Sequence, residues 1–152
     1  MIIIDTASLI PLENSNSLFI LKALFETIFI TPQIEVEFGK PIPDWIKVES
    51  IDTNDVGFKV LIQILGIGEA SAIQLALNHA KNSPLLILDD KKARNCAKSL
   101  NLKISGTLLC LVQAKERKII SSVKDKINEL RRVGFYISNK LEEEILKLAK
   151  EN

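Results

Sequence analysis

Cysteine and histidine are scarce in this chain of 152 residues, which contains two cysteines and one histidine. Cys96 and Cys110 do not make a disulfide framework, and neither has a second ligand at zinc-site spacing. Both fall on predicted apolar helix faces, so we expect buried free thiols in a reducing compartment. His79 lies late in a predicted helix without an acidic or serine partner nearby in sequence, and we interpret it as an ordinary boundary residue. A Ser-His-Asp triad and a histidine metal site are therefore disfavoured.

Motifs that bind nucleotides or activate phosphate esters are also missing. No G-x-G-x-x-G follows the first predicted strand and no G-x-x-x-x-G-K-[ST] occurs, so dinucleotide and P-loop sites are unsupported. A phosphohydrolase of the haloacid-dehalogenase type places a D-x-D motif after its first strand. Here Asp5 is followed by Thr6 and Ala7, so the second acid of that motif is absent.

Long apolar runs and a strong net charge are absent as well. No run approaches the roughly 18 residues of a membrane span. The first residues lack a basic region and reach Asp5 too soon for a signal peptide, so we expect a cytoplasmic protein without membrane contact. The formal net charge of +1 excludes a strong overall field, and contact with nucleic acid must then come from a local basic patch.

What the chain does contain is an alternation of short apolar strands with helices. The strands predicted at 2–4 and 85–88 are continuously apolar, which is typical of strands buried on both faces of a parallel sheet. Further short strands are predicted at 28–30, 46–48 and 102–104. With 47% hydrophobic and 26% charged residues and one composition throughout, the sequence predicts a single domain, residues 1–152, folded as a three-layer α/β/α sandwich.

Capping and breaking residues predict several helix boundaries. Thr31 before a proline is a typical helix start, and Gly39 a typical helix end. A helix is expected to run from a cap at residues 54–55 to Gly66. The glycines around Ile67 break that helix, and a stronger amphipathic helix is predicted to begin at Glu69.

Acidic residues recur at matching places in this pattern. Asp5 and Asp90 each follow an apolar strand and precede a helix, Glu69 is in the first turn of a helix, and Glu37 lies on the short helix after the second strand. Each alone can be a helix cap, which stabilises by about 0.5–2 kcal/mol. If the first and fourth strands are neighbours, however, the acids converge at the carboxyl edge of the sheet, where open α/β sheets bind ligands. Gathered carboxylates repel one another unless a cation lies between them, and oxygen ligands suit Mg²⁺ or Mn²⁺.

Hydroxyl and basic side chains complete the candidate site. Ser8 and Thr107 could each bring a hydroxyl to the rim of the acidic cleft, although local capping is the commoner role. The basic residues of 91–94 begin the helix directly after Asp90 and could hold a substrate backbone, although such runs usually form a solvated helix face. Residues 115–118 form a second basic cluster, and Arg131-Arg132 are interpreted as simply exposed. The candidate substrate-binding residues are Ser8, Lys91, Arg94 and Thr107.

Five segments of the chain resemble the PIN-domain superfamily, closest to a VapC-like branch of it. They are I-I-I-D-T-A-S-L-I, T-P-Q-I-E-V-E-F, G-E-A-S-A-I-Q-L-A, L-I-L-D-D-K-K-A-R and S-G-T-L-L-C-L-V-Q-A-K. The order of G-E-A, D-D-x-x-A-R and G-T-L is quite specific, and the resemblance spans nearly the whole chain. It implies a Rossmann-like sandwich with about five parallel strands in the order 3-2-1-4-5. It also implies acids that bind Mg²⁺ or Mn²⁺ for RNA cleavage.

The resemblance also implies roles for individual acids. Carried over by motif, the catalytic acids are Asp5, Glu37, Glu69 and Asp90. The implied metal site consists of Asp5, Glu69, Asp90 and Asp89.

Two choices among neighbouring acids stay open. Side chains alternate along a strand, so one of Asp89 and Asp90 should turn away from the site. Asp90 is favoured as the ligand and Asp89 as its support, but the reverse remains an alternative. Many VapC-type proteins carry Thr-x-Asp where this chain has Leu88-Asp89-Asp90, so the local ligand network differs. Glu35 competes with Glu37 for the site on the short helix.

The function implied is that of a metal-dependent endoribonuclease resembling the toxin of a toxin–antitoxin pair. Its expected partners are single-stranded or structured RNA, a small antitoxin protein and a second copy of the chain in a homodimer. The alternative is a non-catalytic PIN-like module that binds RNA or a protein, which would cleave nothing with any metal.

Overall fold

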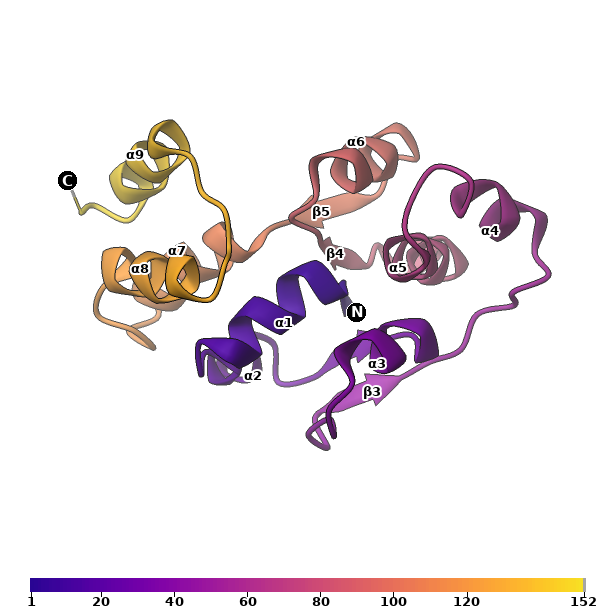
Figure 1. Ribbon diagram of the computed structural model, residues 1–152, viewed down its shortest axis with the longest axis horizontal. Helices are drawn as coiled ribbons and strands as arrows, with labels where there is room; N and C mark the ends of the chain where they lie inside the picture. Colours follow the sequence, from indigo (N-terminus) through magenta and orange to yellow (C-terminus); the bar gives the residue numbers. More distant parts are fainter. Residues whose placement is uncertain (152) are drawn as a thin grey trace.

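The computed structural model describes residues 1–151 and is built on a parallel sheet of five strands in the order β3-β2-β1-β4-β5 (Figure 1). The predicted α/β architecture and strand order are confirmed. The strands are β1 (Ile2–Ile4), β2 (Ile28–Ile30), β3 (Ile46–Val48), β4 (Leu85–Ile87) and β5 (Lys103–Ser105). The predicted single domain, 1–152, includes Asn152, which lies outside the described residues, and it stays a prediction.

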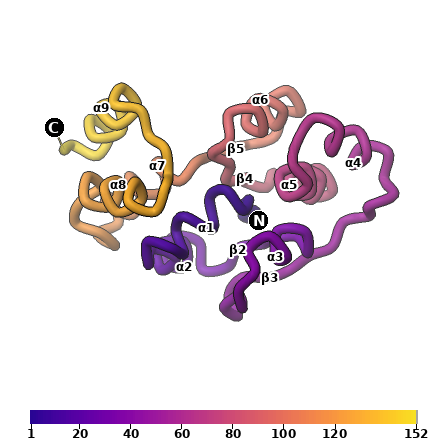
Figure 2. The backbone as a smooth tube through the Cα atoms, in the orientation of Figure 1, coloured from indigo at the N-terminus to yellow at the C-terminus, as the bar shows by residue number. Residues whose placement is uncertain are grey.

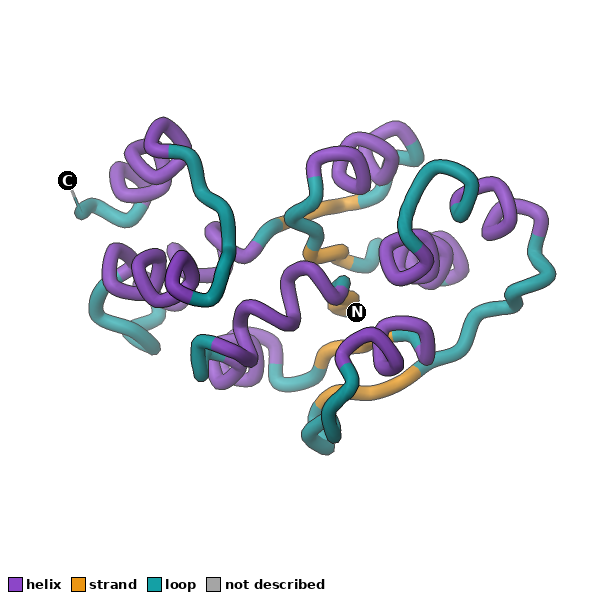
Figure 3. Tube along the Cα trace, in the orientation of Figure 1, coloured by secondary structure: helices purple, strands orange, loops and turns teal. Residues whose placement is uncertain are grey.

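Helices connect the strands and cover both faces of the sheet (Figure 3). On one face α5 contacts β1 and β4, and on the other face α2 contacts β2 and packs against α7. The helices are α1 (Thr6–Asn14), α2 (Leu18–Phe25), α3 (Pro32–Phe38), α4 (Val56–Leu61), α5 (Ile67–Asn78), η1 (Ala80–Asn82), α6 (Lys91–Ser99), α7 (Thr107–Glu116), α8 (Val123–Arg132) and α9 (Asn139–Leu148). Two layers of helices therefore enclose the sheet and leave its carboxyl edge for a site.

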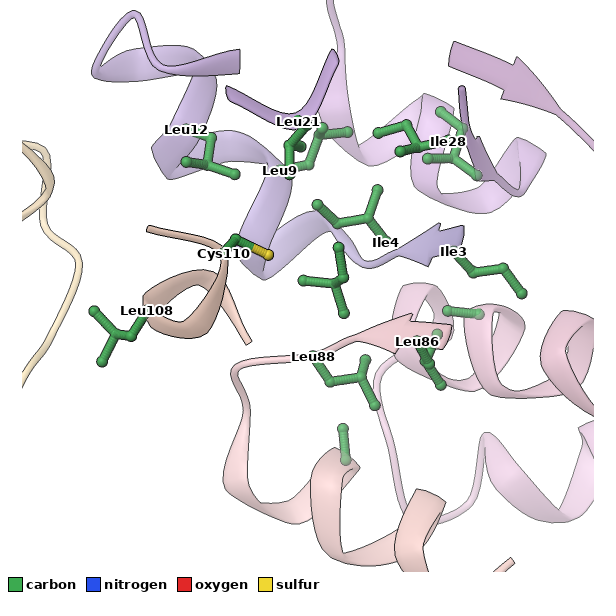
Figure 4. Close-up of a cluster of buried hydrophobic side chains, with 14 of the residues drawn as sticks. Ile3, Ile4, Leu9, Leu12, Leu21, Ile28, Leu86, Leu88, Leu108 and Cys110 are labelled. Atoms are coloured by element: carbon green, nitrogen blue, oxygen red, sulfur yellow. The ribbon is translucent and has the colours of Figure 1, made fainter. Parts of the chain in front are cut away.

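Strand β1 is the centre of the sheet because it pairs with β2 on one side and β4 on the other. Ile3 and Ile4 are completely buried, as are Leu86 and Ile87 of the neighbouring β4. Figure 4 shows the side chains of β1 and β4 within one apolar cluster that Cys110 of α7 also joins. Each such side chain contributes about 1.5–3 kcal/mol by burial. The apolar runs thus place β1 and β4 side by side.

Most predicted helix boundaries are confirmed. The Thr31 hydroxyl accepts a hydrogen bond from the Ile34 N–H at the start of α3, and Gly39 ends that helix with a φ of 69°. Two predicted boundaries are wrong. Helix α4 ends at Leu61 instead of reaching Gly66, and α5 begins at Ile67 instead of Glu69. The segment before Gly66 forms turns, and the glycines expected to break a helix start the next one.

The C-terminal helix α9 lies at one end of the molecule and α4 at the other (Figure 2). Glu142 of α9 forms ion pairs with Lys124 and Arg131 of α8, and these cations hold the pKa of the Glu142 carboxyl below its usual range. Arg131 also donates a hydrogen bond to the Ile137 carbonyl at 2.9 Å. The prediction that Arg131 is simply exposed is therefore wrong, whereas Arg132 is exposed.

The two cysteines differ in burial. Cys110 is buried, and burial raises the pKa of its thiol to about 12. Cys96 is only half-buried, so the prediction of two buried thiols is wrong for this residue because one side of α6 stays open to solvent. Within residues 1–151, no helix has the length and apolar character that crossing a membrane requires.

Candidate functional site

The acids converge where the strand order reverses, between β1 and β4. Ile4 is the register partner of Ile87, so the two strands end side by side. Asp5 follows β1 and donates its backbone N–H to the Ile87 carbonyl at 3.3 Å. Asp89 and Asp90 follow β4 at the same edge. In open α/β sheets this switch point is the usual place for a ligand.

Asp5 is a buried carboxyl whose hydrogen bonds are incomplete. It is only 1% exposed, and its Oδ2 has no hydrogen-bond partner among residues 1–151. The pKa of Asp5 is raised from 3.8 to about 7, chiefly by burial and in smaller part by the nearby carboxylates of Glu69 and Glu37. The backbone N–H groups of Thr6 and Ala7 oppose this rise. A buried polar atom without a partner indicates a missing ligand or proton.

Glu69 and Glu37 complete one side of the site. Glu69 is in the first turn of α5, as predicted, and burial followed by the charge of Asp90 raises the pKa of its carboxyl, while Lys92 opposes this. Glu37 accepts a hydrogen bond from the Thr6 hydroxyl at 2.7 Å. A pocket of about 150 Å³ opens among these side chains. It is lined by Asp5, Thr6, Ala7, Glu37, Gly66, Gly68 and Glu69.

The choice between Glu35 and Glu37 is resolved by the geometry of α3. Glu37 reaches this pocket and influences the pKa of both Asp5 and Glu69, whereas Glu35 does neither. The role of Glu37 in catalysis stays a prediction.

Two of the pocket residues that were not predicted from the sequence determine the position of Glu37. Thr6 holds Glu37 through its hydroxyl. Gly68 leaves the space that Glu37 fills, because a Cβ at this position would lie 1.9 Å from Glu37 Oε1. The signals were present as a hydroxyl directly after Asp5 and as the second glycine before Glu69.

The two acids after β4 point to different partners. Asp90 is exposed, accepts a hydrogen bond from the Ala93 N–H at 2.9 Å at the start of α6, and lies close enough to Glu69 to raise its pKa. Asp89 accepts hydrogen bonds from the Ser8 hydroxyl at 2.6 Å and from the Thr107 N–H at 3.0 Å. Asp90 therefore belongs to the acid cluster, and Asp89 bonds away from it.

Three of the four predicted substrate-binding residues do not face the cleft. Ser8 and Thr107 are completely buried and bond to Asp89, so their placement at the rim is wrong. Arg94 folds back and donates to the Leu88 carbonyl at 2.8 Å and to the Ser105 carbonyl at 3.1 Å. Its Nη1 atom is thus used by the protein. The exposed cations beside the acids are Lys91 and Lys92.

The remaining polar candidates have structural partners. His79 is half-buried, as predicted for a boundary residue, and pairs with Glu49, which follows β3. In the second basic cluster, Lys115 donates to the Ala149 carbonyl at 2.8 Å and Arg117 donates to the Leu24 carbonyl at 3.1 Å. Each of these two cations thus bonds to a backbone carbonyl of another helical segment.

A protein-family model described as a PIN domain matches residues 1–151. The chain belongs to the PIN-domain family. No curated protein and no solved structure matched the chain in the other two comparisons. PIN domains are generally nucleases that use divalent metal ions, so this chain is a nuclease-like module, and its family implies nucleic-acid binding. Its branch within the family stays a prediction.

The acids of this PIN domain fit a divalent cation in the manner typical of magnesium. Among residues 1–151, no three His, Cys, Asp or Glu side chains are placed to hold one ion together. Mg²⁺, however, usually keeps several waters and is held by one or two carboxylates together with substrate phosphates. Asp5 Oδ2 is buried without a partner, and every neighbouring ionisable donor of the pocket is a carboxylate. This donor set fits a hard cation and not a soft one.

Proposed function

We propose that this PIN domain is a Mg²⁺- or Mn²⁺-dependent endoribonuclease that hydrolyses phosphodiester bonds of RNA, as the toxin of a toxin–antitoxin pair does. The observation that carries the proposal is the buried Asp5 Oδ2, which has no partner among the described residues and lies beside other carboxylates. Such an arrangement is costly for the protein alone, because burial and like charge both oppose ionisation. A divalent cation removes that cost.

The chain's own residues take separate roles in this proposal. Asp5, Glu69 and Asp90 are the proposed ligands, one or two of them in direct contact and the rest through water, because the three are not placed to hold one ion together. Glu37, held by Thr6, is the fourth acid. The bound ion supplies Lewis acidity and a more acidic water. The cluster contains no histidine and its carboxylates serve as ligands, so the proposal assigns activation of the water to the ion and not to a side-chain base. Lys91 and Lys92 would hold the phosphate backbone of the substrate.

Partners and compartment follow from the family resemblance. A small antitoxin protein, a second copy of the chain and a cytoplasmic location are part of the proposal and rest on that resemblance alone. RNA is proposed as the substrate on the same ground, together with the exposed lysines that begin α6.

The decisive experiment compares cleavage of single-stranded RNA with and without metal. We expect cleavage with Mg²⁺ or Mn²⁺, none in EDTA, and a loss of about 100-fold or more in Asp90→Asn. Asn still caps α6, so the Tm of this variant should change little. Glu35→Gln removes an exposed acid of α3 that lies outside the pocket and should cleave like wild type. Retained RNA binding without cleavage under any metal would instead identify a binding module.

The lysines at the start of α6 should govern the salt dependence of RNA binding. We expect Lys91→Ala with Lys92→Ala to weaken binding similarly for all sequences. The double variant should also flatten the slope of log K against log salt by about 0.7 for each phosphate that it no longer neutralises. Filter binding at several salt concentrations measures the slope. Lys98→Ala, an exposed lysine at the far end of α6, is the matched control. A slope equal to that of the control would remove both lysines from the site.

A further inference from the structure

Asp89 is the meeting point of three segments at the carboxyl edge of the sheet. Its Oδ2 accepts hydrogen bonds from the Ser8 hydroxyl of α1, at 2.6 Å, and from the Thr107 hydroxyl of α7. Its Oδ1 accepts the Thr107 N–H at 3.0 Å. Both hydroxyl residues are completely buried. A carboxylate that accepts three hydrogen bonds has used most of its capacity, so little remains for a metal ion.

The surroundings of Asp89 tie the same segments together again. Arg94 donates to the carbonyl of Leu88, directly after β4, and to the carbonyl of Ser105, which ends β5. Gly106 leaves no room for a side chain, since a Cβ there would lie 2.9 Å from Asp89 Oδ1 and 3.1 Å from Arg94 Nη1. The turns after β4 and β5 are therefore packed as one unit around Asp89.

This unit connects the two proposed ligands that come from different strands. Asp5 directly precedes α1, the helix that carries Ser8, and Asp90 directly follows Asp89. The bond between Ser8 and Asp89 thus joins the ends of β1 and β4. The bonds to Thr107 fix the direction of the Asp89 side chain, and the next residue, Asp90, lies close enough to Glu69 to raise its pKa.

We infer that Asp89 is a positioning residue of the proposed nuclease site and not a metal ligand. It holds the end of β1 to the end of β4, and so keeps Asp5 and Asp90 at one edge of the sheet. The inference rests on the proposed function, because it takes the site to be that of a metal-dependent nuclease. The hydrogen bonds from which it is argued do not depend on RNA being the substrate. Substitution of residues that support ligands in this way usually changes metal affinity or activity by roughly 10–100-fold.

The experiment measures Mn²⁺ affinity by electron paramagnetic resonance, together with kcat, KM and Tm, on folded protein. The variants are Asp89→Asn, Thr107→Val and Thr107→Ser, with Asp90→Asn as the comparison for a true ligand. We expect Asp89→Asn and Thr107→Val to weaken Mn²⁺ binding about tenfold and to lower kcat more than they change KM for RNA. Thr107→Ser keeps the hydroxyl and should restore both values to within about twofold. Asp90→Asn should weaken Mn²⁺ binding more than either.

Three results would overturn the inference. Asp89→Asn could cost as much Mn²⁺ affinity as Asp90→Asn, which would make Asp89 a ligand. Thr107→Val could lower Tm with affinity and kcat unchanged, which would make the bonds merely structural. Thr107→Ser could fail to rescue Thr107→Val. Wild-type protein that binds Mn²⁺ but cleaves no RNA would contradict the proposed function alone, because the affinity comparison still decides for Asp89. Wild-type protein without Mn²⁺ affinity would contradict both.

Discussion

Asp5→Asn should abolish RNA cleavage and, at pH 8 without divalent ions, stabilise the protein by about 4 kcal/mol. Burial raises the pKa of Asp5 from 3.8 to about 7, so at pH 8 the native state carries a buried charge that the unfolded chain exposes to water. Asparagine removes the charge with almost no change of shape. The side chain of Asp5 makes no N-cap hydrogen bond to α1, and an asparagine oxygen can still face the Thr6 and Ala7 N–H groups that favour the charged carboxylate.

The raised pKa of Asp5 determines how the stability of the wild type changes with pH. Between pH 3.8 and about 7 the unfolded chain has released the Asp5 proton while the native protein keeps it. Unfolding then releases a proton, so the stability of the wild type falls as pH rises through this window. Urea unfolding in EDTA at pH 5 and pH 8 should show this fall in the wild type and a smaller one in Asp5→Asn. Below the window the two proteins should be nearly equal.

A matched charge control separates this effect from a general change in net charge. Asp125→Asn removes one exposed carboxylate of α8 and should shift stability only slightly at either pH. Equal or lower stability of Asp5→Asn at pH 8 would mean that the Asp5 carboxylate stabilises the fold by itself. The case for a cation at this edge would then be lost.

The sheet and the acids that follow its two central strands were predictable because they follow from local patterns. Ile2-Ile3-Ile4 and Leu85-Leu86-Ile87 are apolar without alternation, which marks strands buried on both faces, and both become completely or largely buried neighbours at the centre of the sheet. An acid directly after such a strand lies at the carboxyl edge of the sheet, and this does not depend on the conformation of the loop that follows. The family resemblance added the strand order and the place of Glu37.

The hydrogen bonds of the site were not predictable, because they depend on contacts between distant segments. Ser8 bonds to Asp89 across 81 positions of the sequence, and Thr107 does so across 18. No local pattern distinguishes a hydroxyl at the rim of a cleft from one turned inward to a carboxylate. Arg94 shows the same limit, since its long side chain can reach either solvent or the carbonyls of Leu88 and Ser105.

Gly68→Ala should reduce RNA cleavage about 100-fold with little loss of stability, as displacements near 1 Å can do. The new Cβ would lie 1.9 Å from Glu37 Oε1 and 3.2 Å from the Thr6 hydroxyl oxygen. The flexible end of Glu37 must move away, so it leaves Thr6 and the other acids while the backbone of α5 stays in place. Alanine in the first turn of α5 favours the helix by up to about 1 kcal/mol over glycine, which offsets the crowding.

Gly57→Ala is the matched control, since Gly57 is the second residue of α4 as Gly68 is of α5. A Cβ at Gly57 would lie 3.0 Å from Asp55 Oδ1, away from the acid pocket, and we expect cleavage near the wild-type rate. The double variant Gly68→Ala with Glu37→Gln tests the cause. If Gly68 acts only by making room for the Glu37 carboxylate, the double variant should cleave no more slowly than Glu37→Gln alone. Additive losses of activity would show instead that Gly68→Ala damages the site by another route. One such route is a displacement of Glu69, the next residue of α5.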